Sequence, residues 1–176
     1  MKTTHRTFSA LRVPALLATG LLAAFAWISA SYGAGSDGAT APAGFRTMAQ
    51  TKADYGEARL ALRADFPTDV KIPTLSDQLA SLVDLAGGKA VFEEGFAESQ
   101  LVSTWRCSWE RSYLLAAKNE SRVDLAVARA ALETYYDLDL VKKWVDDPDH
   151  LWFRDVMEPA FRGDLTPLRD DVASSC

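Results

Sequence analysis

The two cysteines have the most definite chemistry in this sequence. Cys107 and Cys176 are the only cysteines among 176 residues, and neither has a second cysteine at CxxC spacing. Outside the cytoplasm, two thiols in one small domain most often form a disulfide bond. We therefore expect an intramolecular Cys107–Cys176 disulfide. A lone reactive thiol at Cys107 and a bridge between two chains are the alternatives.

A second group of candidates consists of acidic and aromatic side chains. Glu93, Glu94 and Glu98 are close in the sequence and offer the pair of carboxyl groups that glycoside hydrolysis uses. Acidic residues are also common before a helix, because they face the positive end of its dipole. The aromatic residues that could line a groove for a sugar or a peptide are Trp105, Trp109, Tyr113, Tyr136 and Trp152. Aromatic residues at helical spacing are, however, more often part of a core.

His150 is the one histidine beyond the N-terminal segment, and Asp146, Asp147 and Asp149 surround it. Carboxylates with one histidine can bind a divalent metal ion. The simpler interpretation, which we favour, is that Asp147 caps a helix whose first turn carries His150 in solvent. We assign neither a metal nor a cofactor to the chain. The motifs of serine hydrolases, zinc peptidases, P-loop proteins and dinucleotide-binding enzymes are missing from the sequence, so no catalytic activity is assigned.

The N-terminal segment has the pattern of an export signal. Lys2, Arg6 and Arg12 precede an uncharged run whose most apolar part is residues 13–30. A cationic start before such a run keeps the N-terminus in the cytoplasm and directs the following chain across the membrane. The run is longer than the core of most cleaved signals and marginal for a spanning helix. We expect residues 13–30 to anchor the chain, with cleavage after Ala30 and secretion as the alternative.

A linker and one domain follow this 1–30 segment. Residues 31–44 hold four Gly, four Ala and one Pro, a composition typical of a flexible tether. Residues 45–176 carry 16 Lys and Arg against 23 Asp and Glu, a net charge of −7. Nucleic-acid binding needs cationic side chains that neutralise phosphates, so this acidic domain disfavours it. We expect an unidentified protein partner, no nucleic acid, and membrane contact only through residues 13–30.

The stretch Phe96–Lys118 should position most of the candidate residues. It contains no proline or glycine, so nothing in it opposes a helix. The residues that recur every four positions along one row of this helix are Leu101, Trp105, Trp109 and Tyr113. Cys107 lies between the two tryptophans, off that row. We predict a central helix, around which the other helices pack and on which Cys107 is available to a crosslink.

Further segments show helical patterns and start signals. The expected helical ranges are 45 or 46 to 65, 75–86, 122–136, 138–145, 148–159 and 168–172. Capping pairs are expected at Thr74 with Asp77 and at Ser121 with Asp124. Residues 89–95 either extend the central helix or form a short extended segment. The sequence thus predicts an all-α bundle of five or six helices, in which residues 162–176 fold back onto the central helix.

Two functions compete on this evidence. The first is an exported, membrane-anchored interaction or accessory module without catalytic activity. The second is an extracytoplasmic ligand-binding protein or small hydrolase, which would use the aromatic groove with Glu93, Glu94 or Glu98. A concave pocket that joins those carboxylates to Trp105 or Trp109 would favour the second function. Tryptophans sealed inside the domain would favour the first.

The export pattern predicts the topology of the chain. A reporter enzyme fused after Gly44 should be active outside the cytoplasm, because the cationic residues hold the N-terminus inside. Intact mass measured on the membrane fraction separates the two outcomes, since an anchored protein retains residues 13–30. Reporter activity confined to the cytoplasm would contradict the predicted export and remove the basis for the disulfide.

Overall fold

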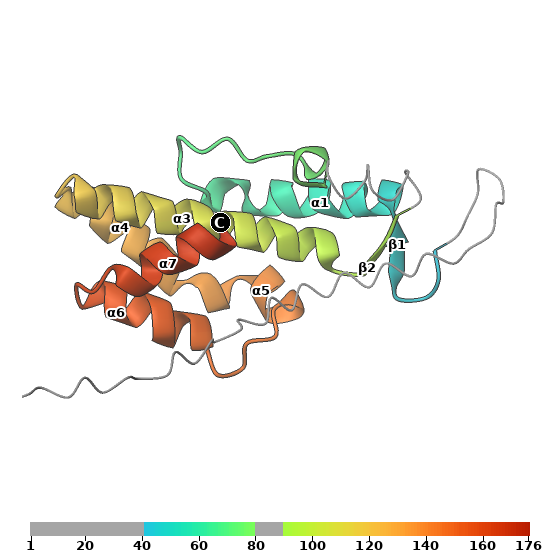
Figure 1. Cartoon of the computed structure of the whole chain (residues 1–176). Coiled ribbons are helices and arrows are strands. Elements are labelled where there is room, and N and C mark those ends of the chain that lie inside the picture. Colours follow the sequence, from blue (N-terminus) through green and yellow to red (C-terminus); the bar gives the residue numbers. More distant parts are fainter. Residues whose placement is uncertain (1–40, 80–89) are drawn as a thin grey trace, which may run out of the picture. The chain divides into compact units, whose positions relative to one another are not determined.

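The structure is a computed structural model that describes residues 41–79 and 90–176. The predicted export segment and most of the linker lie outside these residues. The described part is mostly helical, but it also contains a small sheet that the all-α prediction did not include (Figure 1). Within these ranges, none of the helices has the length and apolar character needed to cross a membrane.

The small sheet pairs two strands from distant parts of the sequence. Strand β1 (Phe45–Thr47) runs antiparallel to β2 (Val91–Glu93), with Phe45 opposite Glu93 and Thr47 opposite Val91. The first helix was predicted to begin at residue 45 or 46, and this boundary is wrong. Thr47 forms a capping box with Gln50, so the helix begins after Thr47. For residues 89–95, the sequence left open a helical or an extended conformation. Residues 91–93 form β2, so this part is extended and does not continue the central helix.

Helix α1 (Met48–Leu62) continues into the short 3-10 helix η1 (Arg63–Asp65). Phe66 is extended, as expected for a residue that precedes proline. The capping pair Thr74 with Asp77 is present, because the backbone N–H of each residue donates to the side chain of the other. Residues 75–79 are helical. The predicted continuation of this helix to residue 86 lies outside the described residues.

Helix α3 (Phe96–Lys118) has the predicted bounds. Its N-cap is Gly95, whose φ of +86° lies in the left-handed region that favours glycine. A Cβ atom at this position would also overlap the indole ring of Trp144. Along the predicted row, Leu101, Trp105 and Tyr113 are buried, while Trp109 is partly buried.

Helix α4 (Arg122–Glu133) packs against α3, and the two helices form a hairpin (Figure 1). Ser121 accepts a hydrogen bond from the backbone N–H of Asp124, as predicted. The helix ends three residues before the predicted end at Tyr136. The following residues form the 3-10 helix η2 (Tyr135–Asp137), and α5 (Asp139–Trp144) comes next.

The predicted helix start at Asp147-Pro148 needs correction. Pro148 lies in a turn and the next helical residue is Leu151. Asp147 still caps this helix, because its carboxylate accepts hydrogen bonds from the backbone N–H groups of Leu151 and Trp152. The chain then forms the π-helix η3 (Phe153–Met157) and α6 (Glu158–Phe161). Pro159 cannot donate an N–H to the preceding turn, which fits the irregular helix at this point.

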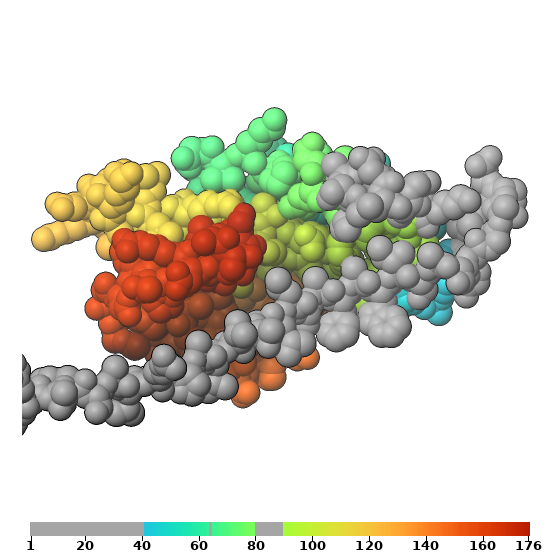
Figure 2. Space-filling model, viewed as in Figure 1, coloured from blue at the N-terminus to red at the C-terminus, as the bar shows by residue number. Residues whose placement is uncertain are grey.

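The C-terminal helix α7 (Thr166–Ser175) is longer than predicted. The carboxylate of Asp164 accepts a hydrogen bond from the backbone N–H of Thr166 at its start. Helix α7 packs against α3, and Figure 2 shows its red atoms lying on the yellow-green ones. The prediction that residues 162–176 fold back onto the central helix is therefore confirmed.

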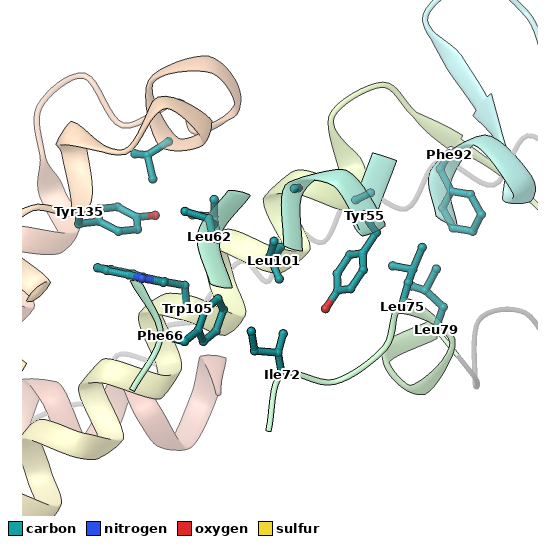
Figure 3. Packing of buried hydrophobic residues seen from close by; sticks show 14 residues of the cluster. Tyr55, Leu62, Phe66, Ile72, Leu75, Leu79, Phe92, Leu101, Trp105 and Tyr135 are labelled. Carbon is teal, nitrogen blue, oxygen red and sulfur yellow. The ribbon is translucent and has the colours of Figure 1, made fainter. Parts of the chain in front are cut away.

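Two hydrophobic clusters fill the interior, and α3 contributes to both. The first contains Trp105, which Figure 3 shows beside Phe66 and Tyr135. The rings of Trp105 and Tyr135 are stacked, with their centres 6.1 Å apart. The second cluster contains Tyr113 together with Met157 and residues of α4, α6 and α7. Because the two clusters share this helix, the aromatic row of α3 forms the centre of the described fold.

Substitution of Trp105 tests the importance of this row. Trp105→Ala should lower the free energy of unfolding by about 3–5 kcal/mol, because the substitution empties a fully buried indole site. The matched control is Leu60→Ala on α1, a side chain that is 74% exposed, which should change stability by less than about 0.5 kcal/mol. Denaturant unfolding measures both. Equal effects of the two substitutions would contradict the described core.

Candidate functional site

The predicted disulfide is present and joins the middle of one helix to the end of another. Cys107 lies near the middle of α3, and Cys176 directly follows α7. Their sulfur atoms are bonded, and their Cα atoms are 5.5 Å apart, a usual separation for a disulfide. The bond therefore ties the C-terminal helix to the central one.

A buried carboxyl group lies beside this disulfide. Glu110 is one turn after Cys107 on α3 and is fully buried. Its Oε1 atom accepts a hydrogen bond of 2.8 Å from the indole N–H of Trp152. Its Oε2 atom lies 3.3 Å from the sulfur of Cys176. Sequence analysis missed this residue, although its spacing of three from Cys107 places both on one side of the helix.

One arginine faces two carboxyl groups at this position. The Nε atom of Arg106 is 3.5 Å from Oε1 of Glu110, and its Nη2 atom is 3.4 Å from Oδ2 of Asp171 on α7. The guanidinium group also lies 5.4 Å from the centre of the Trp152 ring. The single positive charge of Arg106 cannot neutralise two carboxylates. When Glu110 and Asp171 are both ionised, the three side chains together carry a net charge of −1.

The surroundings of Glu110 change its acidity. Burial raises the pKa of Glu110 to about 7, and the nearby Asp171 carboxylate acts in the same direction. The positive charge of Arg106 and the hydrogen bond from Trp152 oppose this rise in pKa. The carboxyl group of Glu110 therefore gains or loses its proton near neutral pH. This titrating group is the one that contacts the sulfur of Cys176.

A polar hollow of about 280 Å³ opens on the disulfide. Both cysteines line it, together with Gln100 and Thr104 of α3. Arg111 also lines the hollow, and its guanidinium group donates a hydrogen bond to the backbone oxygen of Cys176. The disulfide thus borders this hollow and also contacts the buried carboxyl group of Glu110.

The predicted aromatic groove is not formed by the central helix. Trp105 is 1% exposed and Tyr113 is 4% exposed, so neither is available on the surface, contrary to the hypothesis. The indole N–H groups of Trp105 and Trp109 both donate to the backbone oxygen of Asp65, at 2.8 Å each. The hydroxyl group of Tyr113 donates to the backbone oxygen of Ala160. Their polar atoms are therefore satisfied within the fold.

The other two aromatic candidates, Tyr136 and Trp152, are partly buried, and each donates a hydrogen bond to a different carboxyl group. Trp152 donates to Glu110, as described above. Tyr136 donates a 2.5 Å hydrogen bond to Asp147, and its ring stacks on the ring of His150 with 3.8 Å between centres. His150 has a φ of +50° and is exposed. Asp147 is engaged in the helix cap, as the sequence predicted.

The three candidate glutamates are separate from the hollow. Glu93 and Glu94 are exposed at the end of β2, and Glu94 forms a 2.6 Å ion pair with Arg46. Glu98 is partly buried on the first turn of α3. The residues that line the hollow include none of the three, nor Trp105 or Trp109.

Comparisons with protein-family models, with curated proteins and with solved structures find no match for this chain. Its function therefore has to be argued from the residues themselves.

The buried carboxyl group predicts how stability depends on pH. In the folded protein the pKa of Glu110 is about 7, whereas the ordinary pKa of a glutamate is 4.5. The folded state therefore holds this proton to a higher pH than the unfolded state does. The resulting stabilisation is fully present below pH 4.5 and is lost as the pH rises through 7. At about 1.4 kcal/mol for each pH unit of difference, the loss amounts to about 3 kcal/mol.

The comparison is with Glu110→Gln, which cannot titrate. Between pH 5 and pH 8, the free energy of unfolding of the native chain should decrease by about 2–3 kcal/mol more than that of the variant. Denaturant unfolding at several pH values measures the difference. Parallel pH profiles for the two proteins would show that Glu110 is ionised throughout.

Proposed function

We propose that this chain is an exported, membrane-anchored helical module whose function is to bind another protein rather than to act as a hydrolase. The burial of Trp105 and Tyr113 supports this function over a sugar-binding or peptide-binding groove. The separation of the three glutamates from the hollow also disfavours a hydrolase built on them. Anchoring through residues 13–30 is part of the proposal and rests on the charge pattern of the sequence.

The observation that carries the proposal is a second apolar face on α4. Val123 is 74% exposed and Val127 is 54% exposed, and the two are one turn apart. Ala126 and Ala130 are also exposed and lie on the same side of the helix. The opposite side carries Ala128 and Leu132, which are buried against α3 and α6. We call the exposed residues Val123, Ala126, Val127 and Ala130 the α4 stripe.

The chemistry of the α4 stripe defines the partner. Small and branched apolar side chains spaced at three, four and seven positions fit the apolar face of another helix. The charged residues beside the stripe have both signs, with Arg122 and Arg129 near Asp124 and Glu133. A partner helix with charges of both signs would be accepted here, although the domain as a whole is acidic.

The α4 stripe is small, which indicates a weak contact. From Val123 to Val127 and Ala130 it covers about two helical turns, or roughly 10 Å. A surface of this length buries less area than a stable complex usually needs. Anchoring of both partners to one membrane would compensate, because it raises their effective concentration.

Site-specific photo-crosslinking tests this function. A photoreactive amino acid at position 127 of the full chain, expressed in its own host, should form a crosslink to a different protein. Val123→Asp in the same chain should reduce the crosslink at least tenfold, because a charge would be buried at the contact. The control places the photoreactive residue at Leu60 on α1, which is 74% exposed against 54% for Val127, so poorer access cannot explain a weaker crosslink there.

A crosslink at position 127 no stronger than at position 60 would overturn the proposal. Crosslinking only to a second copy of this chain would contradict the proposal that the α4 stripe binds a different protein.

A further inference from the structure

We propose that the Cys107–Cys176 disulfide is a site of thiol–disulfide exchange, and that Glu110 exchanges a proton with the sulfur of Cys176. This activity is separate from the proposed partner binding and does not depend on it. The substrate class is a thiol, either a small molecule or a cysteine side chain of a polypeptide.

The first observation is the carboxyl group itself. A disulfide that only crosslinks two helices needs no ionisable group beside it, and the burial of a carboxyl group is unfavourable. Yet Glu110 is fully buried, and its carboxylate oxygen and the two sulfurs lie within 4.8 Å of one another. Proton transfer requires such contact between the acid and the reacting sulfur.

The second observation is access from solvent. The hollow reaches the disulfide, and Gln100, Ser103 and Thr104 make its α3 side polar. Arg111 adds a positive charge beside the sulfur atoms. A thiolate is the nucleophile in disulfide exchange, so a cationic side chain in the lining of the hollow favours its approach.

The two observations assign a role to each sulfur. A thiolate that enters the hollow attacks Sγ of Cys107 and forms a new sulfur–sulfur bond there. The bond to Cys176 breaks, and Sγ of Cys176 leaves with the electron pair. The carboxylic acid of Glu110, 3.3 Å away, gives its proton to that sulfur. The products are a mixed disulfide at Cys107, a thiol at Cys176 and a carboxylate at Glu110.

A second thiolate completes the exchange. It attacks the sulfur of the mixed disulfide that came from the first external thiol. Cys107 then leaves as a thiolate and takes a proton from water. The external dithiol is thereby oxidised to a disulfide, and the protein is reduced by two electrons. In the opposite direction, the Glu110 carboxylate accepts the proton of the Cys176 thiol, whose thiolate then attacks the mixed disulfide at Cys107.

The charges around Glu110 fit this exchange of a proton. Arg106 on α3 faces the carboxyl group, and Asp171 on α7 competes for the same arginine. Tyr135 of η2 contributes no charge near neutral pH, because burial raises the pKa of its hydroxyl group. Since the pKa of Glu110 is raised to about 7, both its protonated and its ionised forms are available near neutral pH.

Reduction kinetics of the full oxidised chain test the proposal. The probe is dithiothreitol, and the rate constant is divided by the concentration of its thiolate form at each pH. For the native chain this corrected rate constant should fall about tenfold between pH 6 and pH 8, as Glu110 loses the proton that the leaving sulfur needs. Glu110→Gln should show no such fall. Glu133→Gln, an exposed carboxyl group paired with Arg129, is the matched control and should keep it.

Trapping identifies the attacked sulfur. Oxidised protein treated with reduced glutathione and then alkylated should carry glutathione on Cys107 and the alkyl group on Cys176, as located by peptide mass spectrometry. Glutathione found mainly on Cys176 would overturn the assignment of roles. A corrected rate constant that is independent of pH in the native chain, or the same profile in Glu110→Gln, would overturn the proposal itself.

A second variant keeps the test decisive if Glu110→Gln does not fold. Trp152→Phe removes the indole N–H that donates to Glu110, and loss of this bond should raise the pKa of the carboxyl group. The midpoint of the fall in rate should then move to higher pH, while a purely structural role for Glu110 predicts no movement. An unchanged midpoint would contradict the proposal.

Discussion

Burial of α3 on several sides at once is the constraint on which the other elements depend. A helix of 23 residues is about 35 Å long, and the two hydrophobic clusters lie along it. The backbone oxygen of Asp65 accepts both indole N–H groups from this helix. That contact fixes η1, which directly follows α1, against α3, while the disulfide fixes the end of α7. By loop-closure entropy, a crosslink over 69 residues stabilises a fold by about 4 kcal/mol.

The features that sequence analysis predicted well are those with local signals. The bounds of α3 follow from a long stretch without proline or glycine, and Ser121 and Thr74 cap the helices at which they were expected. The strand pairing of Phe45 with Glu93 was not predictable in this way, because it joins short segments far apart in the sequence. The start at Asp147-Pro148 was misplaced for a related reason. Tyr136 contacts both Asp147 and His150 in the turn before Leu151, and no local pattern reports such contacts.

The candidate site was only half predictable. Two cysteines in one domain indicate a disulfide, but the sequence shows Glu110 only as one acidic residue among many on a helix. Its burial depends on α7 covering α3 and on Trp152 donating to it from just before a π-helix. The aromatic groove illustrates the opposite case. The spacing of Trp105 and Tyr113 was read correctly as one row, but their hydrogen bonds to backbone oxygens depend on tertiary structure.

The close contact between Gly95 and Trp144 has a consequence for how this chain can vary. A larger residue at position 95 would collide with the indole ring, so a smaller side chain at position 144 would relieve the overlap. The smaller side chain would not remove the backbone strain of a non-glycine residue at position 95, because φ there is +86° whatever residue occupies position 144. The dependence between the two positions is therefore one-sided. Among related sequences, position 144 should be free to change while glycine is retained at 95, and the reverse combination should be rare.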